Sequence, residues 1–222
     1  MRTRAITESQ KNERIKAILT SAEKLFLYRN FNSITVQEIA ADAGLAKGSV
    51  YSYFTTKESV YLALLEREFA DWFKSFNEAV SGAEAGTDPR FLSDIITKTF
   101  LGRELFLSLT AILHTLLEEN LSGDDILKFK LFLISGIAGS SEILESRISY
   151  LTAGEGRKVL VTLYALILGV RQISAPSAAA LKVISETPEL HPLKFDFMDE
   201  LRESLRLYLT GIYYKNTGKE KK

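Results

Sequence analysis

The sequence predicts an all-α fold in two parts, a small N-terminal helical domain and a larger C-terminal helical bundle. Two observations predict it. Apolar residues recur every three or four positions along most long segments, which is the period of an amphipathic helix. No segment alternates apolar and polar residues as a half-buried strand does. A hydrophobic share of 46% and a charged share of 25% are those of a globular protein with a sizeable core.

The N-terminal domain is expected over residues 1–55. A first helix is predicted over residues 9–28, where apolar side chains form one stripe. A second helix is predicted to begin at Val36. Thr35 lies just before this helix and Glu38 lies inside it, at the spacing of a capping box. In a capping box the hydroxyl and the carboxylate each accept a hydrogen bond from the other residue's backbone amide.

A short third helix is predicted around residues 47–53. Gly44 allows the tight turn before it, because glycine readily adopts a positive φ. Val50 and Phe54 are expected to face inward, which leaves the other side chains outside. A second capping box is predicted from Thr55 to Glu58, at the start of the next helix. This is a helix-turn-helix, a unit that presents one exposed helix to the DNA major groove, about 12 Å wide.

The C-terminal bundle is expected over residues 56–215, after which residues 216–222 are expected to form a flexible tail. The clearest break within the bundle is the loop that ends at Pro89. Helices apolar on most faces are expected to be central or to lie at an interface. The predicted helices of the bundle cover residues 56–80, 91–100, 105–117, 124–149, 157–175 and 195–214.

The segment TVQEIAADAGLAKGSVYSYFTTKE, residues 35–58, resembles the DNA-binding domain of the TetR family of bacterial regulators. The resemblance covers about residues 10–65, and the remainder resembles the family in length and helical layout. The stretch that begins at Leu113 is also similar to the C-terminal domains of a subset of members. Two positions depart from the pattern: Ala46 replaces a serine that caps the recognition helix, and Asn30 replaces a glycine. The matching residues are Thr35, Val36, Ile39, Ala40, Ala43, Gly44, Lys47, Gly48, Tyr51, Phe54, Lys57 and Glu58.

The resemblance implies a homodimeric transcriptional regulator, a repressor that binds a palindromic operator in double-stranded DNA and is released by a small apolar effector. Tyr51 and Lys57 are expected mainly as phosphate anchors, since phosphate contacts position a domain and base contacts specify the sequence. Arg2 and Arg4 form either a minor-groove arm or a tail without function. The implied DNA-binding residues are Thr35, Lys47, Gly48, Tyr51, Ser52, Tyr53 and Lys57.

The family also implies a four-helix dimer interface and an effector cavity. The alternative that both dimer seams belong to the internal core stays open. The residues expected at the dimer interface are Leu160, Leu163, Ile167, Val170, Leu201, Leu205, Tyr208 and Ile212. The residues expected at the cavity are Phe100, Phe106, His114, Phe132 and Tyr164. The aromatic residues among them are equally compatible with a core, and His114 is expected as a hydrogen-bonded core residue or a pocket liner.

Charge is distributed unevenly along a chain whose net charge is zero. Residues 1–60 hold 9 Lys and Arg against 6 Asp and Glu, a net charge of +3, and residues 61–222 hold 19 against 22, a net charge of −3. The basic end is therefore the end that carries the helix-turn-helix, as DNA binding requires.

Composition argues against several other classes of protein. The chain has no cysteine and two histidines, so disulfides, thiolate sites and histidine-rich metal sites are excluded. No acid–base pair or nucleophile with its base is evident, so neither an enzyme nor a cofactor is expected.

The longest apolar run, residues 159–170, is shorter than the roughly 20 residues of a membrane span, and the first residues lack the apolar stretch of a signal peptide. A cytoplasmic protein is expected. The alternatives are an activator or ligand-independent regulator of the same fold, and an all-helical enzyme or carrier for a lipid-like ligand.

Overall fold

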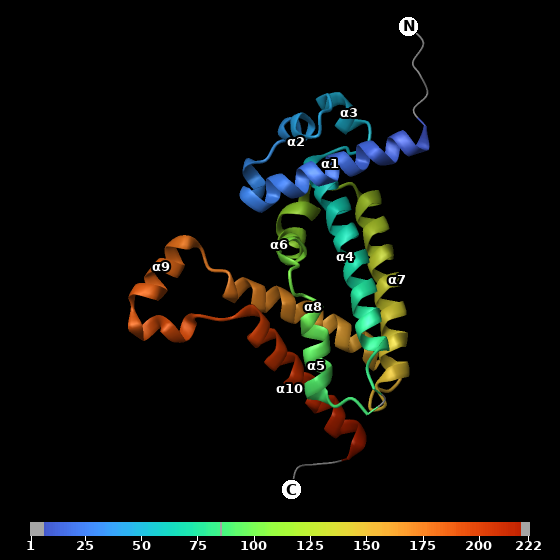
Figure 1. Cartoon of the computed structure of the whole chain (residues 1–222), viewed down its shortest axis with the longest axis vertical. Helices are drawn as coiled ribbons and strands as arrows, with labels where there is room; N and C mark the ends of the chain where they lie inside the picture. The colour runs from blue at the N-terminus through green and yellow to red at the C-terminus, as the bar shows by residue number, and fades with distance from the viewer. Residues whose placement is uncertain (1–6, 85, 219–222) are drawn as a thin grey trace. The chain divides into compact units, whose positions relative to one another are not determined.

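The computed structural model describes residues 7–84 and 86–218, and every regular element in these ranges is helical (Figure 1). The all-α prediction is confirmed. The chain divides into two compact units. The first runs to Phe69 and adds Glu104–Leu131, and the second combines Ala70–Arg103 with the chain from Phe132 onward. Helices α4 (Lys57–Ser81) and α7 (Gly123–Arg147) contribute to both units, and the boundary predicted at residue 55 stays a prediction.

The first unit contains the predicted three helices, α1 (Glu8–Tyr28), α2 (Val36–Asp42) and α3 (Lys47–Tyr51). α2 packs against both α1 and α3, and the two short helices lie on one side of α1 (Figure 1). The turn between α2 and α3 contains Gly44 with φ 68°, as predicted. Val50 is fully buried and attaches α3 to this core.

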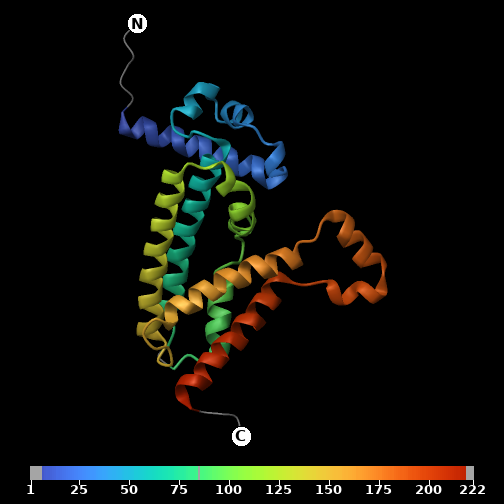
Figure 2. The ribbon, with the colours of Figure 1, turned by 180° about the vertical axis from the view of Figure 1, so that it is seen from behind.

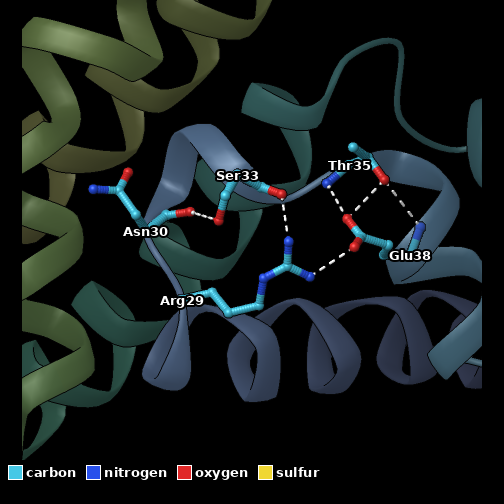
Figure 3. A network of polar contacts seen from close by, with 5 residues as sticks. All are labelled: Arg29, Asn30, Ser33, Thr35 and Glu38. Carbon is cyan, nitrogen blue, oxygen red and sulfur yellow. Dashed lines mark hydrogen bonds and ion pairs between the residues drawn. The ribbon is translucent and has the colours of Figure 1, made fainter.

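The Glu38 carboxylate joins three segments at the start of α2 (Figure 3). Its Oε2 accepts hydrogen bonds from the backbone N–H of Thr35 at 2.9 Å and from the Thr35 hydroxyl at 2.8 Å. The Glu38 N–H donates back to that hydroxyl, so the predicted capping box is confirmed. Arg29, beyond the end of α1, donates to Glu38 Oε1 at 2.7 Å and to the Ser33 carbonyl at 2.5 Å. The entry to the helix-turn-helix is thereby fixed to α1.

The second predicted capping box, from Thr55 to Glu58, is wrong by one residue. The Ser59 N–H donates to the Thr56 hydroxyl at 3.0 Å, and the Thr56 N–H donates to the Ser59 hydroxyl at 3.1 Å. The serine hydroxyl therefore performs the role assigned to the glutamate, and α4 begins at Lys57.

The first unit is completed by α6 (Glu104–Ile112), which packs against α1, and by a π-helical turn at Leu113–Leu117. A 3₁₀ turn, Glu118–Asn120, follows. The predicted single helix over residues 105–117 thus changes its winding after Ile112. The prediction that His114 is a core residue is wrong, because this turn places it on the surface, with Nδ1 2.9 Å from Glu118 Oε2, and its place at a pocket stays a prediction. The two groups form an exposed pair.

In the second unit, α5 (Pro89–Lys98) and α8 (Glu155–Ser174) both pack against α10 (Phe197–Thr217), as Figure 2 shows from behind. Trp72 of α4 stacks on Phe100, with ring centroids 5.4 Å apart. The Trp72 indole N–H donates to the Thr99 hydroxyl at 3.0 Å. The indole N–H is therefore not left unsatisfied in the apolar core.

The buried carboxylate of Glu155 holds the end of α10 to the start of α8. Burial raises its pKa, but hydrogen bonds from the Thr152 N–H and from Lys215 and Asn216 outweigh that effect and bring the pKa to about 2. α10 therefore continues to Thr217, and residues 216 and 217, expected in the tail, are helical. Residues 219–222 lie outside the described residues.

The sequence did not predict α9 (Ala178–Glu186), which is followed by a 3₁₀ segment, Pro188–Leu193. Neither segment contains a buried residue. In both views they lie beyond the ends of α8 and α10 that they connect (Figures 1 and 2). Without a core-facing stripe, the period on which helix prediction depends is weak.

Two further features concern the described part of the chain. No single helix there has the length and hydropathy of a membrane span. α8 and α9 reach that length and hydropathy only when taken together, and a 66° bend separates them. Within the same residues, no group of three or more His, Asp or Glu side chains is arranged to hold a metal ion.

The Glu38 network predicts a dependence of stability on pH. Hydrogen bonds from Arg29 and then Thr35 lower the Glu38 pKa from 4.5 to about 2. Because the pKa is lowered in the folded state, the stabilisation is complete above pH 4.5 and is lost as the pH falls toward 2. Glu38→Gln is expected to flatten the slope of unfolding free energy against pH in this window. Denaturant titrations at steps of pH measure the slope.

Arg29→Met is the companion variant, because it removes the principal cause of the shift while leaving the carboxylate. It is expected to reduce the same slope in part. An unchanged slope in Glu38→Gln would contradict the assigned role of this network.

Candidate nucleic-acid interface

Helix α3 is exposed on one face, which carries four of the predicted DNA-binding residues. Val50 on the opposite face is fully buried. Since the helix has fewer than two turns, a single buried anchor and its two flanking turns determine its orientation. The exposed residues are Lys47, Gly48, Tyr51 and Ser52. The prediction that α3 presents an outward face is confirmed.

The exposed face of α3 is ordered by contacts within the helix. The Lys47 ammonium lies 5.8 Å from the centroid of the Tyr51 ring, within the range of a cation–π interaction. The Ser52 hydroxyl donates to the Gly48 carbonyl at 3.1 Å. A side-chain carbon placed on Gly48 would meet nothing within 4 Å, so the chain's own packing does not require glycine there. Gly48 leaves space for the close approach of another molecule.

Ala46 is the N-cap residue of α3 and makes no side-chain capping hydrogen bond. The capping hydrogen bond that a serine could supply, typically worth about 1 kcal/mol of helix stability, is therefore missing. The helix is instead held by the exit from α2 and the buried Val50.

Tyr53 lies differently from the other predicted contact residues. It is half-buried and lines a cleft of about 200 Å³ whose walls include Ser59, Leu62 and Glu66 of α4. The structure therefore separates Tyr53 from the face that carries Lys47 and Tyr51. Its assignment as a DNA-binding residue stays a prediction.

Lys57 is half-buried at the first residue of α4. Its ammonium donates to the Phe31 carbonyl at 2.9 Å and lies 4.1 Å from the centroid of the Phe31 ring. The sequence gives no sign of this contact, which joins residues 26 positions apart. Lys57 therefore has a structural role that the phosphate-anchor prediction overlooked.

Thr35 is exposed, and its hydroxyl already takes part in the capping box with Glu38 (Figure 3). Arg29 was not singled out from the sequence, because no local pattern relates it to a carboxylate nine positions away. Arg2 and Arg4, the predicted arm, lie outside the described residues.

The residues predicted for an effector cavity are divided between the two units. Phe106 is buried against Phe69, with ring centroids 4.8 Å apart, and Phe100 is buried under Trp72. Phe132 and Tyr164 are half-buried. These contacts are those of core residues, and a cavity common to the five residues stays a prediction.

The residues predicted at the dimer interface point into the second unit. Seven of the eight are buried within the chain, namely Leu160, Leu163, Ile167, Val170, Leu201, Leu205 and Ile212, and Tyr208 is half-buried. This part of the prediction is wrong, because the strongest apolar stripe of a helix packs against its own core. The outward residues of α8 and α10 are others, including Val161 and Leu207.

Comparison with known proteins adds an independent line of evidence. Residues 18–64 match the profile described as bacterial regulatory proteins, tetR family. Residues 66–216 match the profile described as tetracyclin repressor-like, C-terminal domain. Together the two matches cover most of the chain.

The relatives match about a third of this chain. The uncharacterised HTH-type transcriptional regulator YuxN of Bacillus subtilis is 36% identical over 78 residues, 35% of this chain and 26% of the relative. The HTH-type transcriptional repressor NemR of Escherichia coli is 33% identical over 76 residues, 34% of this chain and 38% of the relative. The chain thus spans about a quarter to two fifths of the length of these relatives.

Solved structures share the fold over nearly the whole chain. The fatty acid degradation regulator FadR from Bacillus halodurans has a TM-score of 0.57 at 18% identity, over 89% of this chain and 95% of that one. Reduced E. coli NemR has a TM-score of 0.54 at 24% identity, over 90% and 96%. The exposed helix-turn-helix, the helical C-terminal part and the two profile matches lead to one conclusion. The chain belongs to the tetR family of bacterial regulatory proteins.

Proposed function

We propose that this protein is a DNA-binding transcriptional regulator, and specifically a cytoplasmic repressor that binds a palindromic operator as a homodimer and is released by a small apolar effector. The observation that carries the proposal is the outward face of α3, held rigidly by Val50 and by the turns on either side. Several relatives that match part of the chain are named transcriptional repressors. A regulator rather than an enzyme is proposed because the relatives are regulators.

The outer faces of α8 and α10 support the homodimer. Val161 is 50% exposed and Leu207 is 59% exposed, one on each helix. Gly169 and Gly211 lie on the same exposed sides, and a side-chain carbon on either would meet nothing within 4 Å. A glycine inside a helix costs about 1 kcal/mol relative to alanine, so glycines without a packing role in their own chain favour close contact with another helix. Two-fold pairing of these faces would give an isologous interface.

A dimer accounts for recognition of a palindrome. One three-helix domain contacts few bases, whereas two domains read half-sites about one helical turn apart. An effector releases DNA only if it binds the DNA-incompetent conformation more tightly, with a typical coupling of about 1–3 kcal/mol. Helix α4 can transmit such coupling, because it begins directly after the helix-turn-helix and contributes to both units.

The first prediction concerns DNA binding itself. In mobility-shift titrations with DNA from upstream of the protein's own gene, specific binding is expected to weaken steeply with salt, since Lys and Arg contacts release counterions. Tyr51→Ala is expected to reduce affinity roughly tenfold, because it removes an exposed contact from the α3 face. Tyr28→Ala is the matched control, since Tyr28 is 84% exposed on α1. Equal affinities for both variants would argue against the assigned face.

The second prediction separates structural from DNA-contacting lysines. Lys57→Ala is expected to lower the free energy of unfolding by about 1–2 kcal/mol, because it removes a half-buried, charge-assisted hydrogen bond and a cation–π contact. Lys47→Ala is expected to leave stability unchanged and to lower DNA affinity. Chemical denaturation and DNA titration of both variants measure the two effects. Unaltered stability in Lys57→Ala would remove its structural role.

The third prediction concerns the homodimer. Val161→Glu is expected to increase the dimer dissociation constant at least roughly tenfold, because it places two charges in an apolar two-fold interface. Sedimentation equilibrium measures the constant. Leu101→Glu is the control, since Leu101 is 63% exposed and belongs to neither α8 nor α10. An unchanged constant in Val161→Glu would rule out this interface.

A further inference from the structure

Helix α7 carries an apolar stripe that its own chain does not cover. Leu127 and Leu131 are each 57% exposed, and Ile134 is 65% exposed. The three residues are four and three positions apart, so they lie on one face of the helix. Because α7 is one uninterrupted helix, this alignment follows from helix geometry alone. Large apolar side chains gathered in this way are typical of an interaction site.

The same face continues into small residues toward the C-terminal end of α7. Ser135, Ala138 and Gly139 are all exposed. A side-chain carbon on Gly139 would meet nothing within 4 Å, whereas one on Gly136 would lie 2.3 Å from the Phe73 ring. Gly136 is therefore explained by packing within the chain, and Gly139 is not. Gly139 therefore has no packing role within the chain, and it leaves space for the close approach of another helix.

The stripe is symmetric in position around Ser135. Large residues on one side match small residues on the other, and a positive charge matches a negative one. Leu131 lies four positions before Ser135, and Gly139 lies four positions after it. Lys128 and Glu142, both exposed, lie seven positions before and after it. In an antiparallel pair of α7 helices crossing at Ser135, Leu131 of each copy would face Gly139 of the other, and Lys128 would face Glu142.

We propose that the exposed face of α7, defined by Leu127, Leu131, Ile134, Ala138 and Gly139, binds the same face of a second copy of this chain in antiparallel orientation. The stripe between Lys128 and Glu142 is about 21 Å long. Each leucine fills the space beside a glycine, and two identical ion pairs fix the register. The residues are distinct from those of the pairing proposed for α8 and α10, and the two pairings together would link two dimers into a tetramer.

The test is sedimentation equilibrium of the full chain over a roughly hundredfold range of concentration. Leu131→Asp is expected to halve the limiting mass, and Leu101→Asp, an equally apolar exposed site, is expected to leave it unchanged. Gly139→Leu is expected to abolish the same association, although leucine is the better helix former. A limiting mass unaffected by Leu131→Asp or by Gly139→Leu would overturn the proposal.

A charge exchange tests the orientation of the two helices. Lys128→Glu and Glu142→Lys are each expected to weaken the association roughly tenfold, because each places like charges opposite one another twice. The double variant is expected to restore it to within about twofold. Failure of the double variant to restore association would exclude the antiparallel register. Loss of the α8 and α10 dimer instead appears with Val161→Glu, so the two proposals fail separately.

Discussion

The position of α3, the exposed helix of the helix-turn-helix, depends on the carboxylate of Glu38. Glu38 closes the capping box of α2 through Thr35 and holds Arg29, which also bonds the Ser33 carbonyl. α1, the 3₁₀ turn and α2 are thereby fixed to one another before the chain reaches Gly44. From that point a left-handed glycine and the buried Val50 leave α3 a single orientation. The rigidity that recognition of DNA requires is therefore supplied upstream of the helix that performs it.

The helical glycines lie on two kinds of surface, one packed against the chain's own core and one exposed. Gly136 is required by the Phe73 ring of its own chain. Gly139, Gly169 and Gly211 meet open space although each lies inside a helix. A glycine on an exposed helix face leaves space for the close approach of another helix. The exposed faces of α7, α8 and α10 share this property, which supports an assembly of more than one chain.

Prediction from sequence succeeded where local hydrogen bonding decides the structure. The Thr35–Glu38 capping box, the turn at Gly44 and the missing cap at Ala46 each depend on residues within a few positions of one another. It failed where the partner is distant. The contact from Lys57 to Phe31 and the clamp from Glu155 to Lys215 and Asn216 have no local pattern. The buried dimer candidates failed for a related reason, because periodicity identifies an apolar face without showing what covers it.

The sequence by itself determined the all-helical class, the helix-turn-helix and the outward face around Lys47 and Tyr51, since helix period and capping chemistry are local properties. Only the tertiary structure decided which apolar faces were internal, that Tyr53 turns toward α4, that His114 lies on the surface and that α7 keeps an uncovered stripe. The physical reason is that burial depends on which segments meet in space. Residues close in sequence specify a helix, but residues far apart in sequence specify its environment.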